Sequence, residues 1–178
     1  MPAANPNPAM ITDALWRCWT DVEPNVPGVR LGGIAANKVC YHNSVNANKA
    51  SWPGAYCIQL PLDLQGPFDK ARAIDYTMSD IEMRRRTAYL QDAALHPDDN
   101  RLKAVREFIG TLDGVNVYCL IRDANGVWRF DGTRDPSHLW HIHVSIYTAY
   151  VNSWPDLEGL VSVLLGEPWD VWLARKNG

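Results

Sequence analysis

Residues 138–143 read His-Leu-Trp-His-Ile-His, so three of the five histidines of the chain fall within six positions. In an extended strand, successive side chains point to opposite faces of the sheet. His141 and His143 then share one face with Ser145. The opposite face is apolar and consists of Trp140, Ile142, Val144 and Ile146. The pattern predicts a strand with one face in the core and two imidazoles on the other face.

The two imidazoles on this face stand about 7 Å apart at their Cβ atoms. This spacing suits two ligands of one metal ion, or one ligand beside a catalytic imidazole. His138 faces the other way in a regular strand, where it would cap the start of the strand. The alternative interpretation is an ordinary half-exposed strand whose polar residues point to solvent.

The length and composition are those of a globular domain. With 178 residues, of which 47% are hydrophobic and 21% charged, the chain can bury a substantial core. We expect a flexible, Pro- and Asn-rich arm over residues 1–9 and a single domain over residues 10–178. The net charge of -3 gives no electrostatic argument for binding nucleic acid.

The chain carries no pattern that targets it to a membrane. The N-terminal residues lack the charged and apolar regions of a signal peptide. No run approaches the roughly 18 apolar residues of a membrane span. The sequence therefore predicts a protein made in the cytoplasm without a signal peptide or a membrane span.

The four cysteines form no CxxC pair, so a structural zinc finger is not expected. Cys57 and Cys119 lie in apolar runs and are predicted to be buried thiols.

Start and stop signals predict a mixture of helices and strands. Ser79-x-x-Glu82 is a capping box that begins a helix over residues 80–95. Residues 123–126, Asp-Ala-Asn-Gly, are typical of a hairpin turn. Further helices are expected over residues 10–20, 98–109, 155–165 and 169–175, and strands over residues 55–60, 115–122 and 127–130. This mixture indicates an α+β fold.

Asp75 is the strongest candidate ligand outside the histidine-rich strand. If residues 69–77 are extended, small side chains on the same face leave room for a group to approach Asp75. A catalytic zinc ion needs about three protein ligands and an open position for water, and a nearby base must accept the proton of that water. His42, Asp69 and His138 are further groups of the right type. The alternative for Asp75 is a capping or salt-bridged carboxylate.

Residues 70–77, followed later by His-x-x-His-x-His, resemble the LAS-type zinc peptidases. This group includes lysostaphin, the D-Ala-D-Ala carboxypeptidases and hedgehog-like domains. Ala73-Ile74-Asp75 is similar to the end of the first family motif, Ser-x-His-x-x-Gly-x-Ala-x-Asp. The resemblance implies a small antiparallel sheet flanked by helices, with zinc as the cofactor. It implies Asp75 and His143 as zinc ligands and His141 as the catalytic imidazole. A second register makes His141 the ligand and places His138 where the family has a catalytic Glu.

The chain departs from this family at the first ligand. Counting back from the Ala-x-Asp motif, that ligand falls at position 68, which is Phe68. His42 is the best substitute, since it follows a stretch expected to be extended, and Asp69 is next because it adjoins the expected position. The alternatives are a hydrogen-bonded surface histidine and an aspartate paired with Lys70 or Arg72.

The resemblance implies a zinc peptidase that acts on bacterial cell-wall peptide, of the kind encoded by actinobacterial phages. Such a protein is made in the host cytoplasm and acts at the cell wall or within a phage particle. Trp52 and Trp140 are expected to line a substrate groove. The alternative function is an inactive virion or cell-wall-binding protein that keeps the peptidase fold and contacts other virion proteins through residues 1–9.

Overall fold

The computed structural model describes residues 3–132 and 135–178. Four of the predicted helices are confirmed, and two of them begin with the expected side-chain cap. Helix α1 (Asp13–Val22) begins at Thr12, whose side chain accepts a hydrogen bond from the backbone N–H of Leu15. Ser79 caps α3 (Asp80–Leu95) in the same way. The remaining helices are α2 (Val45–Ser51), α4 (Trp154–Leu165) and α5 (Trp169–Asn177).

The described residues form an α+β fold around one antiparallel sheet of six strands. The spatial order of the strands is β1-β2-β6-β3-β4-β5. Their bounds are Arg30–Gly33 for β1, Ala73–Thr77 for β2, Val105–Gly110 for β3, Tyr118–Arg122 for β4, Trp128–Phe130 for β5 and His141–Ile146 for β6. The histidine-rich strand β6 lies near the middle of the sheet, between β2 and β3, which are distant from it in sequence.

Two sequence predictions of secondary structure are wrong. The helix expected over residues 98–109 is replaced by strand β3, in which every residue is buried, including Arg106 and Glu107. A strand covered on both faces shows no polar–apolar alternation, so its apolar residues matched a helical period by chance. The strand expected over residues 55–60 is the short 3-10 helix Tyr56–Ile58.

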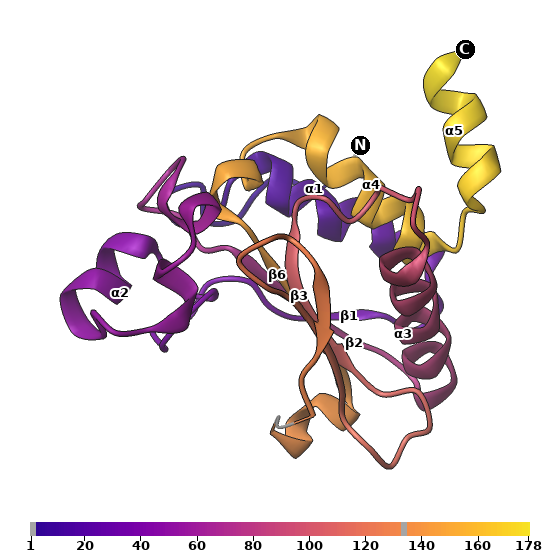
Figure 1. The fold of residues 1–178 in the computed structure, drawn as a ribbon, viewed down its shortest axis with the longest axis horizontal. Coiled ribbons are helices and arrows are strands. Elements are labelled where there is room, and N and C mark those ends of the chain that lie inside the picture. Colours follow the sequence, from indigo (N-terminus) through magenta and orange to yellow (C-terminus); the bar gives the residue numbers. More distant parts are fainter. Residues whose placement is uncertain (1–2, 133–134) are drawn as a thin grey trace.

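The apolar face of the sheet packs against three helices. Ile74 and Tyr76 of β2 and Ile142 and Val144 of β6 belong to one core cluster with residues of α1, α3 and α4. Figure 1 shows α1 and α4 side by side, with α3 beside the sheet and α5 projecting from the body. This core holds the central strands rigidly in one register, which fixes where their opposite faces point.

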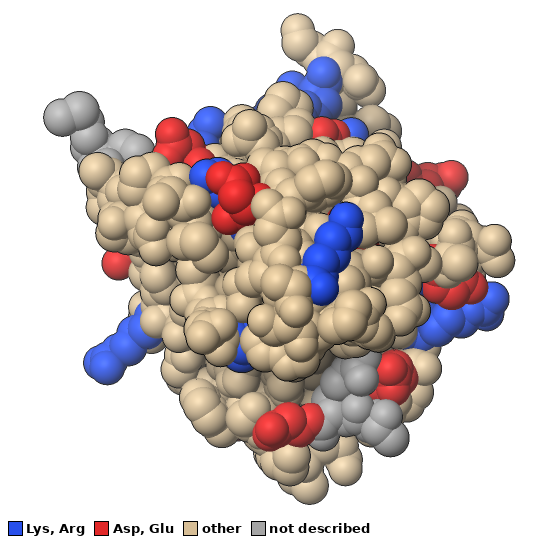
Figure 2. Space-filling model, turned by 90° about the vertical axis from the view of Figure 1, so that its left-hand side faces the viewer, with Lys and Arg blue, Asp and Glu red and all other residues tan. Residues whose placement is uncertain are grey.

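The other face of the central strands is covered by residues 34–72. This segment contains α2, which lies apart from the other helices in Figure 1. A second, smaller core forms there from Tyr41, Val45, Cys57, Ile58 and Ala73. On the side of the molecule shown in Figure 2, acidic and basic side chains are scattered among uncharged residues, without a basic tract.

Gly32 of β1 allows close approach to Asp75. A Cβ atom at Gly32 would lie 2.8 Å from Asp75 Cβ and 3.2 Å from Thr77 Oγ1. We predict that Gly32→Ala lowers the free energy of unfolding by about 1–3 kcal/mol, because the added methyl group overpacks this contact. Gly54→Ala is the control, since a Cβ there meets nothing within 4 Å. Urea denaturation of both variants checks this, and equal stability of the two would contradict it.

Candidate metal centre

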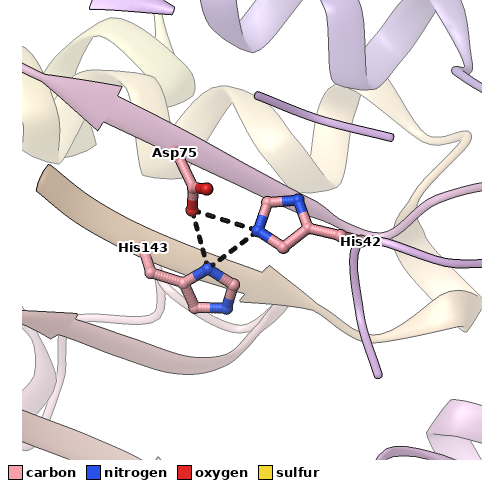
Figure 3. Close-up of side chains that lie close together, drawn as sticks. All are labelled: His42, Asp75 and His143. Atoms are coloured by element: carbon pink, nitrogen blue, oxygen red, sulfur yellow. Dashed lines mark hydrogen bonds and ion pairs between the residues drawn. The ribbon is translucent and has the colours of Figure 1, made fainter. Parts of the chain in front are cut away.

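His42, Asp75 and His143 meet at one buried point (Figure 3). Asp75 on β2 and His143 on β6 are direct partners across the antiparallel pair, a position that brings Cβ atoms to about 5 Å. Asp75 Oδ1 lies 2.8 Å from His143 Nδ1 and 3.1 Å from His42 Nε2, and the two ring nitrogens are 3.1 Å apart. The three residues are 3–9% exposed.

His42 lies on a turn that the neighbouring backbone holds in place. Its carbonyl accepts a hydrogen bond from the N–H of Ala36 at 2.8 Å, and the carbonyl of Tyr41 accepts from the N–H of Arg72 at 2.6 Å. Nδ1 of His42 lies 2.8 Å from the carbonyl oxygen of Ile34. A carbonyl only accepts hydrogen bonds, so Nδ1 carries the proton. In this tautomer Nε2 presents a lone pair to the other two residues.

The orientation of His143 follows from a buried chain of hydrogen bonds. Ser145 Oγ donates to Glu107 Oε1 at 3.0 Å, and His143 Nε2 lies 2.8 Å from Ser145 Oγ. The hydroxyl proton is directed at the carboxylate, so Nε2–H must donate to Ser145 Oγ. In the tautomer that this chain selects, Nδ1 of His143 also presents a lone pair. Tyr56 reinforces the chain by donating to Glu107 Oε1 at 2.6 Å.

These hydrogen bonds leave three electron-pair donors facing one another without a proton between them. Two imidazole lone pairs and a carboxylate oxygen repel at 2.8–3.1 Å unless a cation lies among them. The cation is either a proton or a metal ion. Ligands of a tetrahedral zinc ion, bonded at about 2.0–2.1 Å, stand about 3.3 Å apart, so the three atoms need to separate only slightly to hold one.

The Asp75 carboxylate is held in its charged form. Burial alone would raise its pKa, but the hydrogen bonds with His143 and His42, and the charges of those rings, outweigh burial and hold the pKa of Asp75 well below its usual range. Those hydrogen bonds need a proton on a ring nitrogen, so without a metal a proton takes the place among the three atoms, and a metal ion that binds there must displace it.

His141 and His138 lie beside the three-residue cluster. His141 Nε2 is 3.9 Å from Asp75 Oδ1, and its buried Nδ1 has no hydrogen-bond partner among the described residues. Strand β6 begins at His141, so the expectation that His138 continues the strand and faces away is wrong. His138 lies in the 3-10 helix Pro136–Leu139, and its ring centroid is 4.6 Å from that of His141 and 5.8 Å from that of His143.

Both neighbouring imidazoles favour the neutral form. Burial lowers the pKa of His138 to about 4, although the backbone carbonyl of Asp135 opposes the shift. Burial also lowers the pKa of His141, against the attraction of Asp75. An uncharged imidazole can accept a proton at neutral pH, whereas an imidazole that is already a cation cannot.

A cleft of about 320 Å³ gives access to the cluster. It is lined by Lys38, Val39, Cys40, Tyr41, His42, Tyr56, Glu107, Ile109, Asp135, His138 and His143. Neither Trp52 nor Trp140 is among these described lining residues; Trp140 is 59% exposed and packs edge-on against His141. A larger hollow of about 640 Å³, between α1 and α4, contains no member of the cluster.

The remaining candidate and the missing family ligand lie outside the cluster. The Asp69 carboxylate is largely exposed and pairs with Lys70 at 2.9 Å. Phe68 packs against the small core, where Lys49 lies over its ring. Of the two substitutes, the structure brings His42 rather than Asp69 to Asp75 and His143.

Sequence reasoning missed Glu107, the buried acid at the end of the Ser145 chain. The sequence predicts a helix over residues 98–109, and a helix there gives no reason to expect Glu107 near the histidines. The observed register pairs Glu107 with Ser145 and Ile109 with His143. If residues 105–110 are read as a buried strand, Glu107 falls in the core. A buried acid requires a hydrogen-bonding partner, and this requirement is the signal that could have found it.

No protein-family model, curated protein or solved structure shows significant similarity to this chain. The resemblance to the LAS-type peptidases therefore stays a prediction. None of the helices within residues 3–132 and 135–178 has the length and apolar character that a membrane span requires.

With zinc as the probe metal, we predict that Ser145→Ala weakens metal binding at this cluster about 10- to 100-fold, because it breaks the chain that fixes the His143 ring. Chelator competition measures the dissociation constant. Ser162→Ala removes another buried serine, on α4, and is expected to leave zinc affinity unchanged. Equal affinities of wild type and Ser145→Ala would show that the chain does not position His143.

Proposed function

We propose that the chain is a zinc-dependent hydrolase that acts on bacterial cell-wall peptide. The observation that carries the proposal is the convergence of His42 Nε2, Asp75 Oδ1 and His143 Nδ1 at one buried point beside a cleft. Two imidazoles and a carboxylate are a common ligand set of catalytic zinc, and three protein ligands leave a position for water. The sequence resemblance supplies the substrate class.

A bound zinc ion would supply an activated water molecule whose pKa falls towards 7. The residues of this chain then have separate tasks. His42, Asp75 and His143 would hold the ion, and Ser145 and Glu107 keep His143 oriented. His141 adjoins Asp75 and favours the neutral form, so its imidazole can accept a proton from the water and return it to the leaving amine.

The cleft has the size and polarity to hold a short peptide. Its volume of about 320 Å³ lies at the lower end of the range of small-ligand pockets. Lys38 and Asp135 give its wall one cationic and one anionic side chain. These groups can pair with the carboxylate and the amine of a peptide that carries both charges. Stem peptides of the cell wall are of this kind.

One observation favours a second candidate, a cell-wall-binding or virion protein without catalysis. Phe68 stands at the position of the first family ligand and is part of the small core. A metal site rebuilt around His42 has a different geometry from that of the family, and it can serve structure rather than hydrolysis. The same ligand set also suits iron(II), so the identity of the metal must be measured.

We predict that the purified protein binds one zinc ion per chain. His42→Ala, Asp75→Ala and His143→Ala should each remove the ion, because each deletes one of only three protein ligands. Elemental analysis gives the metal content. Asp69→Ala is the matched control and should retain zinc, because that carboxylate is exposed and pairs with Lys70. Stoichiometric iron, or zinc retained by all three ligand variants, would contradict the proposal.

We predict that zinc-loaded wild type hydrolyses stem peptides and that His141→Ala slows this about 10²- to 10⁴-fold while keeping its zinc, as expected for loss of an acid–base group. Mass spectrometry of the released peptides measures the rate. His96→Ala is the control, since His96 packs near Trp169. A zinc-loaded wild type that binds cell walls without cutting them would exclude the hydrolase and favour the second candidate.

A further inference from the structure

Two cysteines, Cys40 in the wall of the cleft and Cys57 in the small core behind it, have no part in the proposed zinc site. Cys57 is fully buried in the small core, and Cys40 packs against that core while lining the cleft. The neighbouring residues Tyr41 and Tyr56 pack edge-to-face with ring centroids 5.9 Å apart, so the two segments that carry the cysteines meet in this small core. We propose that Cys40 and Cys57 form a reversible disulfide that ties the turn carrying His42 to the helix Tyr56–Ile58.

The backbone of Cys40 has a conformation that the surrounding residues impose. Its φ is +74°, and no other described residue apart from glycine has a positive φ. The buried side chain of Asn48 holds this conformation from both sides. The N–H of Cys40 donates to Asn48 Oδ1 at 2.8 Å, and Asn48 Nδ2 donates to the carbonyl of Cys40 at 3.0 Å. Such a strained conformation persists only where the structure enforces it, and here it accompanies the contact with Cys57.

The two cysteines of the pair differ in their access to solvent. The guanidinium of Arg72 is fully buried, and its Nη1 donates to the carbonyl of Cys57 at 2.9 Å. This cation adjoins the buried member of the pair, whereas Cys40 is the partly exposed member that a small disulfide can reach from the cleft. The other two cysteines differ from the pair: Cys18 is buried in α1 with its thiol directed at the carbonyl of Ala14, and Cys119 is buried in β4.

The step balances with a small disulfide such as oxidised glutathione as the co-reactant. The sulfur of Cys40, which is accessible from the cleft, attacks one sulfur of glutathione disulfide and releases one glutathione thiol. The sulfur of Cys57 then attacks the mixed disulfide, forms the Cys40–Cys57 bond and releases the second glutathione. The two protein thiols lose their protons to the two departing thiolates, so the protein is oxidised and the glutathione disulfide is reduced.

Oxidation would act on the His42 turn. Cys40 lies two residues before His42, and its carbonyl accepts a hydrogen bond from the N–H of Asn43. A covalent bond to the helix Tyr56–Ile58 would fix one end of this turn. The redox state of the pair is therefore coupled to the position of His42, whether or not a metal is bound there.

The experiment treats the native, full-length protein with oxidised glutathione, blocks remaining thiols under denaturing conditions, and maps the peptides by mass spectrometry. We expect a crosslink between the peptides of Cys40 and Cys57 that dithiothreitol reverses, with Cys18 and Cys119 recovered as blocked thiols. A stable glutathione adduct on Cys40 beside a free Cys57, the absence of any crosslink, or a crosslink in another pair would overturn the proposal.

Variants separate the two sulfurs. Cys57→Ser removes the second nucleophile and should leave the mixed disulfide on Cys40, whereas Cys119→Ser should crosslink like wild type. Cys57→Ser without glutathione on Cys40 would contradict the role of Cys40 as the attacking sulfur. The wild-type peptide map needs no variant to fold, and the crosslink is read without any metal, so its outcome is independent of the zinc proposal.

Discussion

The pairing of β2 with β6 is the constraint on which the candidate site depends. Asp75 and His143 are opposite one another only in the observed register. If either strand shifted by one residue, its own member of the pair would turn towards the helices, because strand side chains alternate with a period of two. Ile74 and Val144 prevent such a shift, since they are fully buried in the core beneath α1, α3 and α4. The hydrophobic core on one face of the sheet therefore positions the polar cluster on the other.

The third member of the cluster depends on a different interaction. Residues 34–72 leave the sheet and return to it, and Arg72 anchors the return. Its fully buried guanidinium donates to the carbonyl of Cys57 and to Thr148 Oγ1, lies 3.7 Å from Asp63, and stacks on the ring of Tyr41. One buried cation thus joins the segment that carries His42 to the end of β6. A buried charge with several partners is a strong orienting device, because any alternative arrangement leaves it unpaired.

Patterns within one element were predictable from the sequence. The alternation in residues 141–146 correctly placed His141, His143 and Ser145 on one face, and the capping box at Ser79 correctly placed the start of α3. Both signals are local, since they arise from the geometry of a single strand or a single helix turn. The prediction failed for residues 105–110, where burial on both faces of β3 removed the alternation that marks a strand.

The sequence by itself determined which groups were available: an α+β chain with paired imidazoles on one strand, a carboxylate at Asp75 and a spare histidine at His42. Only the tertiary structure decided that these groups meet, that His42 rather than Asp69 completes the cluster, and that Glu107 orients His143 through Ser145. The physical reason is that these contacts span up to 101 residues of chain. These long-range contacts are fixed by the register of the sheet and by the anchoring of residues 34–72. Neither of these can be read from the spacing of residues along the chain.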